Sequence, residues 1–279
     1  MAHGETRSGY RFDSERLDRV ERRFWREIWE SVPAEVSREH GVESHELGPA
    51  QATLVRALPN AQMPNLVLGG TRQGAVADGS LGAALDRVAA AGVAAKVPVL
   101  AGDPEATAAE GLLRSRSYEP GYAWMRFVRD AHEPRFRVPD EVEVTTADDG
   151  GQSPFGMIAA TGFGLPAWAA AFFAGLPGRD GWRCYLASVG AEPQACAAML
   201  VDDDIAQFGI AATLEPARGR GCQRALLRRR ILDAAAAGCE TLFVETGERI
   251  PGRPSPSYRN ILAAGFEEAY LRPNWSPTG

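Results

Sequence analysis

Cysteine and histidine are both scarce in this sequence, and their positions exclude several kinds of site. The 279 residues include four cysteines, all late in the chain: Cys184, Cys196, Cys222 and Cys239. No two of these cysteines have CxxC spacing, so we expect free thiols in a reducing compartment and no metal site. All four histidines lie in the first half, which excludes a Ser-His-Asp triad or a histidine-based metal site confined to the second half.

The sequence also lacks the features of membrane, secreted and nucleic-acid-binding proteins. No apolar run is long enough to cross a bilayer, and the N-terminus MAHGETRSGYRF has no apolar core of the kind found in signal peptides. The net charge of −6 disfavours a nucleic-acid partner. We therefore expect a cytoplasmic protein that has neither a membrane nor a nucleic acid as its partner.

Charge and proline divide the chain near its midpoint. Residues 131–142 read AHEPRFRVPDEV, a composition typical of a linker. A boundary near residue 134 predicts two domains, residues 1–134 and residues 135–279. In the first domain, a helix with its N-cap at Ser14 is expected to pack an aromatic stripe on the core.

The second half alternates between strand-like and helix-like patterns. A long helix is expected from about Gly221 to Ala237, ending at Gly238, followed by a strand at residues 241–246. A short helix near residues 257–264 and a last strand complete the order. The run Asp202–Asp204 predicts a hairpin turn and not a metal site, because three adjacent carboxylates cannot all face one ion.

The segment before the long helix has the features of an anion-binding turn. The start of a helix leaves backbone N–H groups without intrahelical partners and carries partial positive charge. Gly219 and Gly221 would allow a phosphate to approach these N–H groups. Arg218, Arg220 and Arg224 add positive charge at the same place, although solvated arginines on an exposed helix are the alternative interpretation.

This turn resembles the signature [QR]-x-x-G-x-[GA] of the Gcn5-related N-acetyltransferase (GNAT) superfamily. The matching stretch runs over Arg218, Gly219, Arg220, Gly221, Cys222 and Gln223. Gln223 departs from the pattern, since the family has Gly or Ala at that position. The order of the surrounding elements and the Gly265–Phe266 pair after the last helix extend the resemblance over about residues 140–275.

The resemblance implies an α/β (α+β) fold, with a mixed and mostly antiparallel sheet flanked by helices. It also implies an N-acetyltransferase that uses acetyl-coenzyme A and a small-molecule primary amine, as a monomer or a homodimer. Coenzyme contacts are expected from the strand end, the turn and the last helix, at Ala211, Ala212, Thr213, Arg218, Gly219, Arg220, Gly221, Cys222, Gln223, Arg224, Ser257 and Asn260.

The catalytic residues are less well defined by the resemblance. The family often supplies its general acid from a tyrosine four residues before the GF pair, where this sequence has Ile261. Tyr258, one helical turn earlier, is the candidate acid, and Glu245 at the end of the preceding strand is the candidate base. Ile261 and Gln223 favour an alternative, a catalytically silent coenzyme A-binding or regulatory protein. Another acyl or amino-acyl donor is also possible.

The first half contains a faint echo of the second. Residues 113–122 align without gaps on residues 261–270, so that Ser117-Tyr118 corresponds to Gly265-Phe266. This echo predicts a tandem arrangement with a degenerate GNAT-like N-terminal domain, which lacks the signature and serves as a lid, a substrate wall or a dimer surface. The alternative is an unrelated α/β domain.

Overall fold

The computed structural model describes residues 3–61, 63–147 and 152–278 of the chain, which forms two compact units. Unit 1 comprises residues 1–2, 21–125 and 270–279, and unit 2 comprises residues 3–20 and 126–269. These units differ from the two consecutive halves predicted around residue 134. The reason is that helix α1 (Ser14–Glu30) and strands β7 (Tyr118–Asp130) and β13 (Glu267–Pro277) each give residues to both units.

Unit 1 combines short strands with two helices packed on one apolar core. Its elements are α2 (Ala34–His40), β3 (Val42–Leu47), β4 (Ala50–Val55), β5 (Leu66–Leu68), α3 (Ser80–Ala90), β6 (Val97–Pro98) and α4 (Ala106–Ser115). Strands β3, β4 and β5 form an antiparallel sheet, and a parallel bridge joins Leu66 of β5 to Lys96 just before β6. Leu54, Leu85, Leu113 and Trp275 are among the buried residues of this core.

Unit 2 contains a mixed, mostly antiparallel sheet. Its elements are β1 (His3–Glu5), β2 (Arg11–Asp13), β8 (Val142–Thr146), α5 (Gln152–Gly162), η1 (Ala167–Ala170), α6 (Ala171–Ala174), β9 (Trp182–Val189), β10 (Pro193–Asp202), β11 (Ile205–Thr213), η2 (Glu215–Ala217), α7 (Cys222–Ala236), β12 (Thr241–Gly247) and α8 (Pro256–Ala263). The strand order is β13-β7-β12-β11-β10-β9-β8. Among the described pairs from β8 to β12, β11 and β12 are parallel and the others are antiparallel. This confirms the predicted fold class, a mixed and mostly antiparallel sheet flanked by helices.

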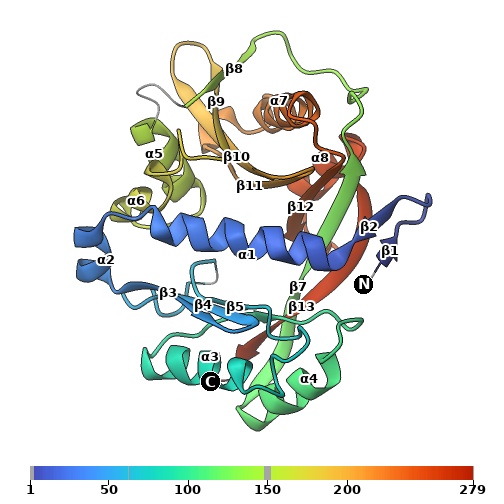
Figure 1. Ribbon diagram of the computed structural model, residues 1–279. Coiled ribbons are helices and arrows are strands. Elements are labelled where there is room, and N and C mark those ends of the chain that lie inside the picture. Colours follow the sequence, from blue (N-terminus) through green and yellow to red (C-terminus); the bar gives the residue numbers. More distant parts are fainter. Residues whose placement is uncertain (1–2, 62, 148–151, 279) are drawn as a thin grey trace. The chain divides into compact units, whose positions relative to one another are not determined.

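Helices cover both faces of the unit 2 sheet. Arg230 of α7 stacks on Phe208 of β11 at 4.6 Å, and Gln223 of α7 is hydrogen-bonded to Asn260 of α8, so these two helices share one face. Gly162 of α5 lies against Ala212 of β11 so closely that an added Cβ would come within 2.5 Å of the Ala212 side chain. Figure 1 shows α5 and α7 on opposite sides of this sheet. No helix among the described residues is both long and apolar enough to span a membrane.

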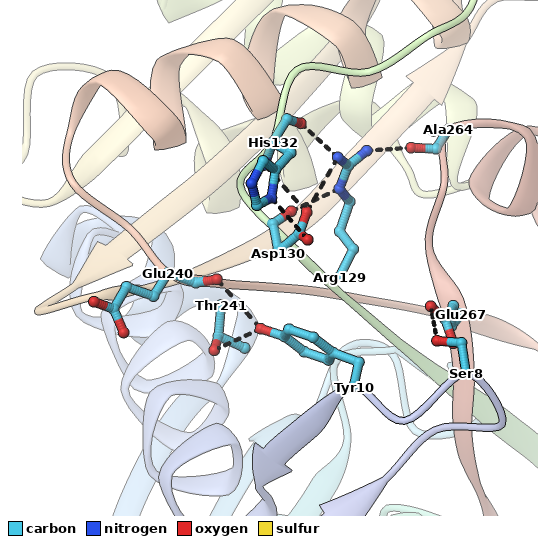
Figure 2. A network of polar contacts seen from close by, with 9 residues as sticks. All are labelled: Ser8, Tyr10, Arg129, Asp130, His132, Glu240, Thr241, Ala264 and Glu267. Atoms are coloured by element: carbon cyan, nitrogen blue, oxygen red, sulfur yellow. Dashed lines mark hydrogen bonds and ion pairs between the residues drawn. The ribbon is translucent and has the colours of Figure 1, made fainter.

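A polar network ties the N-terminal residues of unit 2 to its later strands (Figure 2). The Tyr10 hydroxyl is hydrogen-bonded to the Thr241 hydroxyl at 3.0 Å and to the Glu240 carbonyl at 3.2 Å. Ser8 donates to the carboxylate of Glu267 at 2.6 Å. Arg129, near the end of β7, donates to the main-chain carbonyl of Ala264. The contacts of Ser8 and Tyr10 explain why residues 3–20 group with unit 2, although residues of unit 1 follow them in the chain.

Two details of local structure bear on the sequence predictions. Asp13, and not Ser14 as predicted, caps α1, because its carboxylate accepts hydrogen bonds from the N–H groups of Glu15 and Arg16. The aspartate run forms the predicted hairpin turn, in which Asp202 pairs with Ile205. The described residues contain no group of three or more His, Cys, Asp or Glu side chains that could hold a metal ion.

Candidate functional site

Strands β11 and β12 pair over only part of their length. The parallel register runs from Ile205 with Thr241 to Phe208 with Val244, whereas β11 continues to Thr213 and β12 to Gly247. Among the described residues, β11 and β12 are paired over this register and not beyond it. We call the region between residues 209–213 and residues 245–247 the slot. The pairing of these two strands therefore ends where the resemblance predicts that they diverge.

A β-bulge in β11 accounts for this divergence. The register with β10 shifts between Cys196 and Ala198, which leaves one β10 residue opposite both Ile210 and Ala211. Ile210 has a φ of 48°, a left-handed conformation that is strained for a β-branched residue. A bulge bends its strand and increases the local twist, which turns the end of β11 away from β12.

The predicted anion-binding turn lies directly beyond the slot. Gly219 and Gly221 have φ values of 78° and 90°, which residues with a side chain rarely adopt. Gly221 is the N-cap of α7, so the N–H groups of the following residues begin the helix without intrahelical acceptors. In the described chain the N-cap of α7 makes no side-chain capping hydrogen bond, whereas the N–H of Arg220 donates to the carbonyl of Ala217 at 3.3 Å. A Cβ atom at Gly219 would have no heavy atom within 4 Å, so the turn is open at that point.

The predicted arginines differ in what they contact. Arg218 folds back, and its Nε donates to the carbonyl of Thr213 at 3.3 Å. The Arg224 guanidinium lies 5.4 Å from the ring centroid of Phe136, a linker residue. Arg220 is exposed beside the turn. Arg218 and Arg220 therefore lie at the turn and Arg224 packs on the linker, and a contact of any of them with a coenzyme stays a prediction.

The linker is part of this site, which the sequence did not indicate. Pro139 packs against the turn so closely that a Cβ atom on Gly221 would lie 2.6 Å from the proline Cγ. Gly221 is therefore required both by its left-handed backbone and by this contact. Phe136 and Pro139 together cover one side of the first turn of α7.

Gln223, the residue that departs from the GNAT signature, is hydrogen-bonded to the neighbouring helix α8. Gln223 accepts a hydrogen bond from the amide of Asn260 at 2.6 Å, so its side chain joins α7 to α8. Cys222 is buried, and this burial raises the pKa of its thiol, so only its backbone is available at the turn. Ser257 lies partly buried in the first turn of α8.

Glu245 is the first residue of β12 beyond the paired register, at the closed end of the slot. Its carboxylate forms an ion pair with Arg126 of β7, at 2.9 Å from Nη2 and 3.1 Å from Nε. The Arg126 side chain is fully buried and stacks on Phe243 at 4.8 Å, whereas the Glu245 side chain is 15% exposed. The sequence predicted Glu245 as the candidate base but gave no signal for its partner Arg126, which lies in an otherwise apolar stretch of β7.

Tyr258 contacts strands β7 and β13, which do not border the slot. Its ring packs edge-to-face on Phe127 of β7 at 4.7 Å, and its hydroxyl donates to Glu268 of β13 at 2.6 Å. Burial and the neighbouring Glu268 carboxylate raise the pKa of this hydroxyl. In the strand order, β7 and β13 lie beyond β12 on the side away from the slot. Since adjacent strands are about 4.8 Å apart, the hydroxyl lies well outside the slot.

Glu245 and Tyr258 consequently lie on opposite faces of the sheet. Val244 is paired with Phe208, whose ring faces α7, so the next residue, Glu245, points to the other face. Phe127 contacts Tyr258 on the α7 and α8 face, and its neighbour Arg126 points away with Glu245. The two candidate catalytic side chains are therefore not brought together.

No protein-family model and no curated protein matches this chain. Solved structures do match it. A GCN5-related N-acetyltransferase from Kribbella flavida has a TM-score of 0.57 at 14% identity, covering 88% of this chain and 91% of that chain. One from Sphaerobacter thermophilus has a TM-score of 0.58 at 14% identity, covering 82% and 76%. A tandem GNAT protein from the clavulanic acid biosynthesis pathway has a TM-score of 0.55 at 17% identity, covering 82% and 79%. The chain therefore has the fold of the GNAT acetyltransferases.

Proposed function

We propose that unit 2 binds acetyl-coenzyme A and transfers its acetyl group to a primary amine of a small molecule. The observation that carries this proposal is the slot between β11 and β12, which leads directly into an open, glycine-containing turn at the N-terminus of α7. The slot offers backbone groups to an extended chain with amide groups, and the turn offers N–H groups to a pyrophosphate. A coenzyme A thioester contains both of these parts in that order.

The residues present fit such a ligand. The backbone of Ala211–Thr213 would hold the pantetheine arm, and the N–H groups of Gly219 and of residues 221–224 would hold the pyrophosphate. Gly219 leaves space at the turn, and exposed Arg220 adds positive charge beside it. Gln223 does not oppose this fit, because its side chain is directed toward Asn260 of α8. The fold shared with GNAT acetyltransferases supports the same ligand.

Acyl transfer at this site would use both faces of the sheet. The ammonium group first loses one proton, and the neutral amine nitrogen then attacks the thioester carbonyl. A C–N bond forms, the C–S bond breaks, and the second proton that leaves the nitrogen goes to the departing thiolate, which is released as the free thiol. The α7 and α8 face carries the phosphate turn, so an acceptor would approach the slot from the face of Glu245. The carboxylate of Glu245 is placed there to attract a cationic amine and to accept its proton, either directly or through water.

The ion pair with Arg126 limits how strongly Glu245 acts as a base. A guanidinium at 2.9 Å stabilises the carboxylate anion, which suits electrostatic attraction of an ammonium group better than strong proton acceptance. An acid role for Tyr258 requires its hydroxyl to leave Glu268 and to reach the slot. We therefore propose Glu245 as the main acidic group of the site.

The test is calorimetric titration of the purified protein with acetyl-coenzyme A, using Gly219→Trp as the blocking variant. A Cβ atom at Gly219 would have no heavy atom within 4 Å, whereas one at Gly221 would meet Pro139 of the linker, so Gly219 is the position for the blocking side chain. Gly190→Trp is the matched control, because Gly190 also has a left-handed φ, 91°, and open space, but lies in the β9–β10 hairpin.

We expect binding to the parent and to Gly190→Trp, and a loss of at least about tenfold in affinity for Gly219→Trp, equivalent to about 1.4 kcal/mol. Release of free thiol in the presence of a panel of primary amines would then establish transfer. No binding by the parent protein would contradict the proposal. Binding without thiol release across a broad panel would favour the catalytically silent alternative.

A further inference from the structure

Unit 1 has its own turn between a strand and a helix, at residues 69–79 between β5 and α3. The carboxylate of Glu105 lies in this turn. One oxygen accepts a hydrogen bond from the N–H of Gly74 at 2.7 Å, and the other accepts one from the N–H of Val76 at 2.6 Å. Two backbone N–H groups thus bind one carboxylate, in the way in which such groups bind phosphate or sulfate oxygens.

The position of Glu105 is fixed by its neighbours. Glu105 immediately precedes α4, and its own N–H donates to the carbonyl of Thr71 at 3.1 Å. The Thr71 hydroxyl is in turn hydrogen-bonded to Asp103. The hydrogen bonds from Val76 and Gly74 lower the pKa of Glu105, so the carboxylate is ionised at neutral pH. An anion therefore occupies the turn permanently.

The corresponding turn of unit 2 has no such group. The element order β5-α3-β6-α4-β7 of unit 1 repeats as β11-α7-β12-α8-β13, so residues 69–79 correspond to the turn before α7. Glu105 is the N-cap of α4, and the N-cap of α8 is Ser255, whose side chain makes no capping hydrogen bond. In the described part of unit 2, the N–H groups of residues 219–224 donate to no carboxylate of the chain.

We infer that Glu105 is a built-in substitute for a phosphate-like ligand in unit 1. While Glu105 is in place, residues 69–79 cannot bind an external anion, and the N–H groups of Gly74 and Val76 form an anion site once this carboxylate is removed. The ligand class is a phosphate or pyrophosphate group. This inference does not depend on the proposed activity of unit 2, because it concerns N–H groups of unit 1 alone.

The experiment is an NMR titration of the full-length protein with inorganic pyrophosphate, following the backbone amide signals of Gly74 and Val76. The variant is Glu105→Ala. The matched control is Glu110→Ala, which removes a carboxylate from an exposed ion pair with Arg114 on the same helix and leaves the turn intact. We expect saturable shifts of both signals in Glu105→Ala, and no shifts in the parent or in Glu110→Ala.

Two results of this titration would overturn the inference. One is a folded Glu105→Ala protein whose Gly74 and Val76 signals do not respond to pyrophosphate. The other is a response of the same signals in the parent. A second measurement needs no variant: in the parent, both amide signals should shift with pH at one apparent pKa below the ordinary value for glutamate. If they do not titrate together, Glu105 does not act as the bound anion, and the inference fails.

Discussion

Ser117 and Gly265 hold the same left-handed backbone conformation at the same point of the two units. Their φ values are 59° and 83°, and each residue lies between a helix and the strand that follows it, α4 and β7 in one case and α8 and β13 in the other. The gapless alignment in the sequence pairs these two positions. The residue after each, Tyr118 or Phe266, is buried. The similarity between residues 113–122 and residues 261–270 in the sequence therefore corresponds to a common local structure.

Exchange of these two residues tests this relationship. A left-handed conformation costs a residue with a Cβ about 1–2 kcal/mol, and glycine offsets part of this gain through its greater freedom in the unfolded chain. Ser117→Gly should therefore raise the free energy of unfolding by about 0.5–1 kcal/mol. Gly265→Ser should lower it by about 1 kcal/mol or more, because the added Cβ would also lie 3.3 Å from Arg129 Nη1. Urea unfolding measures both, and changes of the same sign would contradict the argument.

Elements with strong local signals could be predicted from the sequence. The helix expected at residues 221–237 is observed at Cys222–Ala236, because Gly221 and Gly238 adopt left-handed conformations at its two ends. By contrast, α2 and β3 were not predicted. Helix α2 buries no residue, and β3 has the sequence VESHEL, which contains only two apolar side chains. Neither segment has the hydrophobic periodicity on which such predictions depend.

The site could be predicted in part for the same reason. The turn before α7 is local, since its glycines, arginines and helix start are adjacent in the sequence. The partners of the acidic residues are not local. Arg126 is 119 residues from Glu245, and Glu105 is 31 residues from Gly74. Contacts over such separations depend on how the strands and helices assemble, and no short sequence pattern encodes them.

Acid should abolish the stabilising effect of Glu105. The hydrogen bonds from Gly74 and Val76 lower its pKa in the folded state, so the unfolded chain binds its proton more readily. This contribution is fully present above the ordinary glutamate pKa and is lost as pH falls through the lower folded value. Glu105→Gln should therefore melt at a lower temperature than the parent at pH 7, with the difference shrinking below about pH 4. A difference that does not change with pH would contradict this prediction.

Tyr258→Phe separates a structural role of the hydroxyl from an acid role. The hydroxyl donates to Glu268 at 2.6 Å, so its removal should cost about 1.5 kcal/mol of stability, a value typical of a hydrogen bond to a charged group. Because the hydroxyl lies over β7 and β13 and not in the slot, we expect kcat for acetyl transfer to change by less than about threefold, far below the effect of removing a general acid. A loss of about a hundredfold in kcat with unchanged KM would instead establish Tyr258 as the acid.

Glu245→Gln tests the central acidic group of the slot. It replaces the carboxylate by an amide of the same shape and breaks the ion pair with buried Arg126, so the free energy of unfolding should fall by about 3 kcal/mol. We expect kcat/KM for an amine acceptor to fall by about tenfold, equivalent to about 1.4 kcal/mol, because the variant loses the attraction of the carboxylate for the ammonium group. Glu268→Gln is the matched control, because it removes a carboxylate of unit 2 that faces Tyr258 and not the slot.

A variant of Arg126 distinguishes loss of the acidic group from loss of stability. Arg126→Met leaves the Glu245 carboxylate in place but removes the guanidinium at 2.9 Å, so it breaks the same ion pair as Glu245→Gln. If the carboxylate itself acts on the acceptor, kcat/KM of Arg126→Met should stay well above that of Glu245→Gln. Equal losses of kcat/KM in the two variants would show that Glu245 acts through the fold, and the acidic group of the site must then be sought elsewhere in the slot.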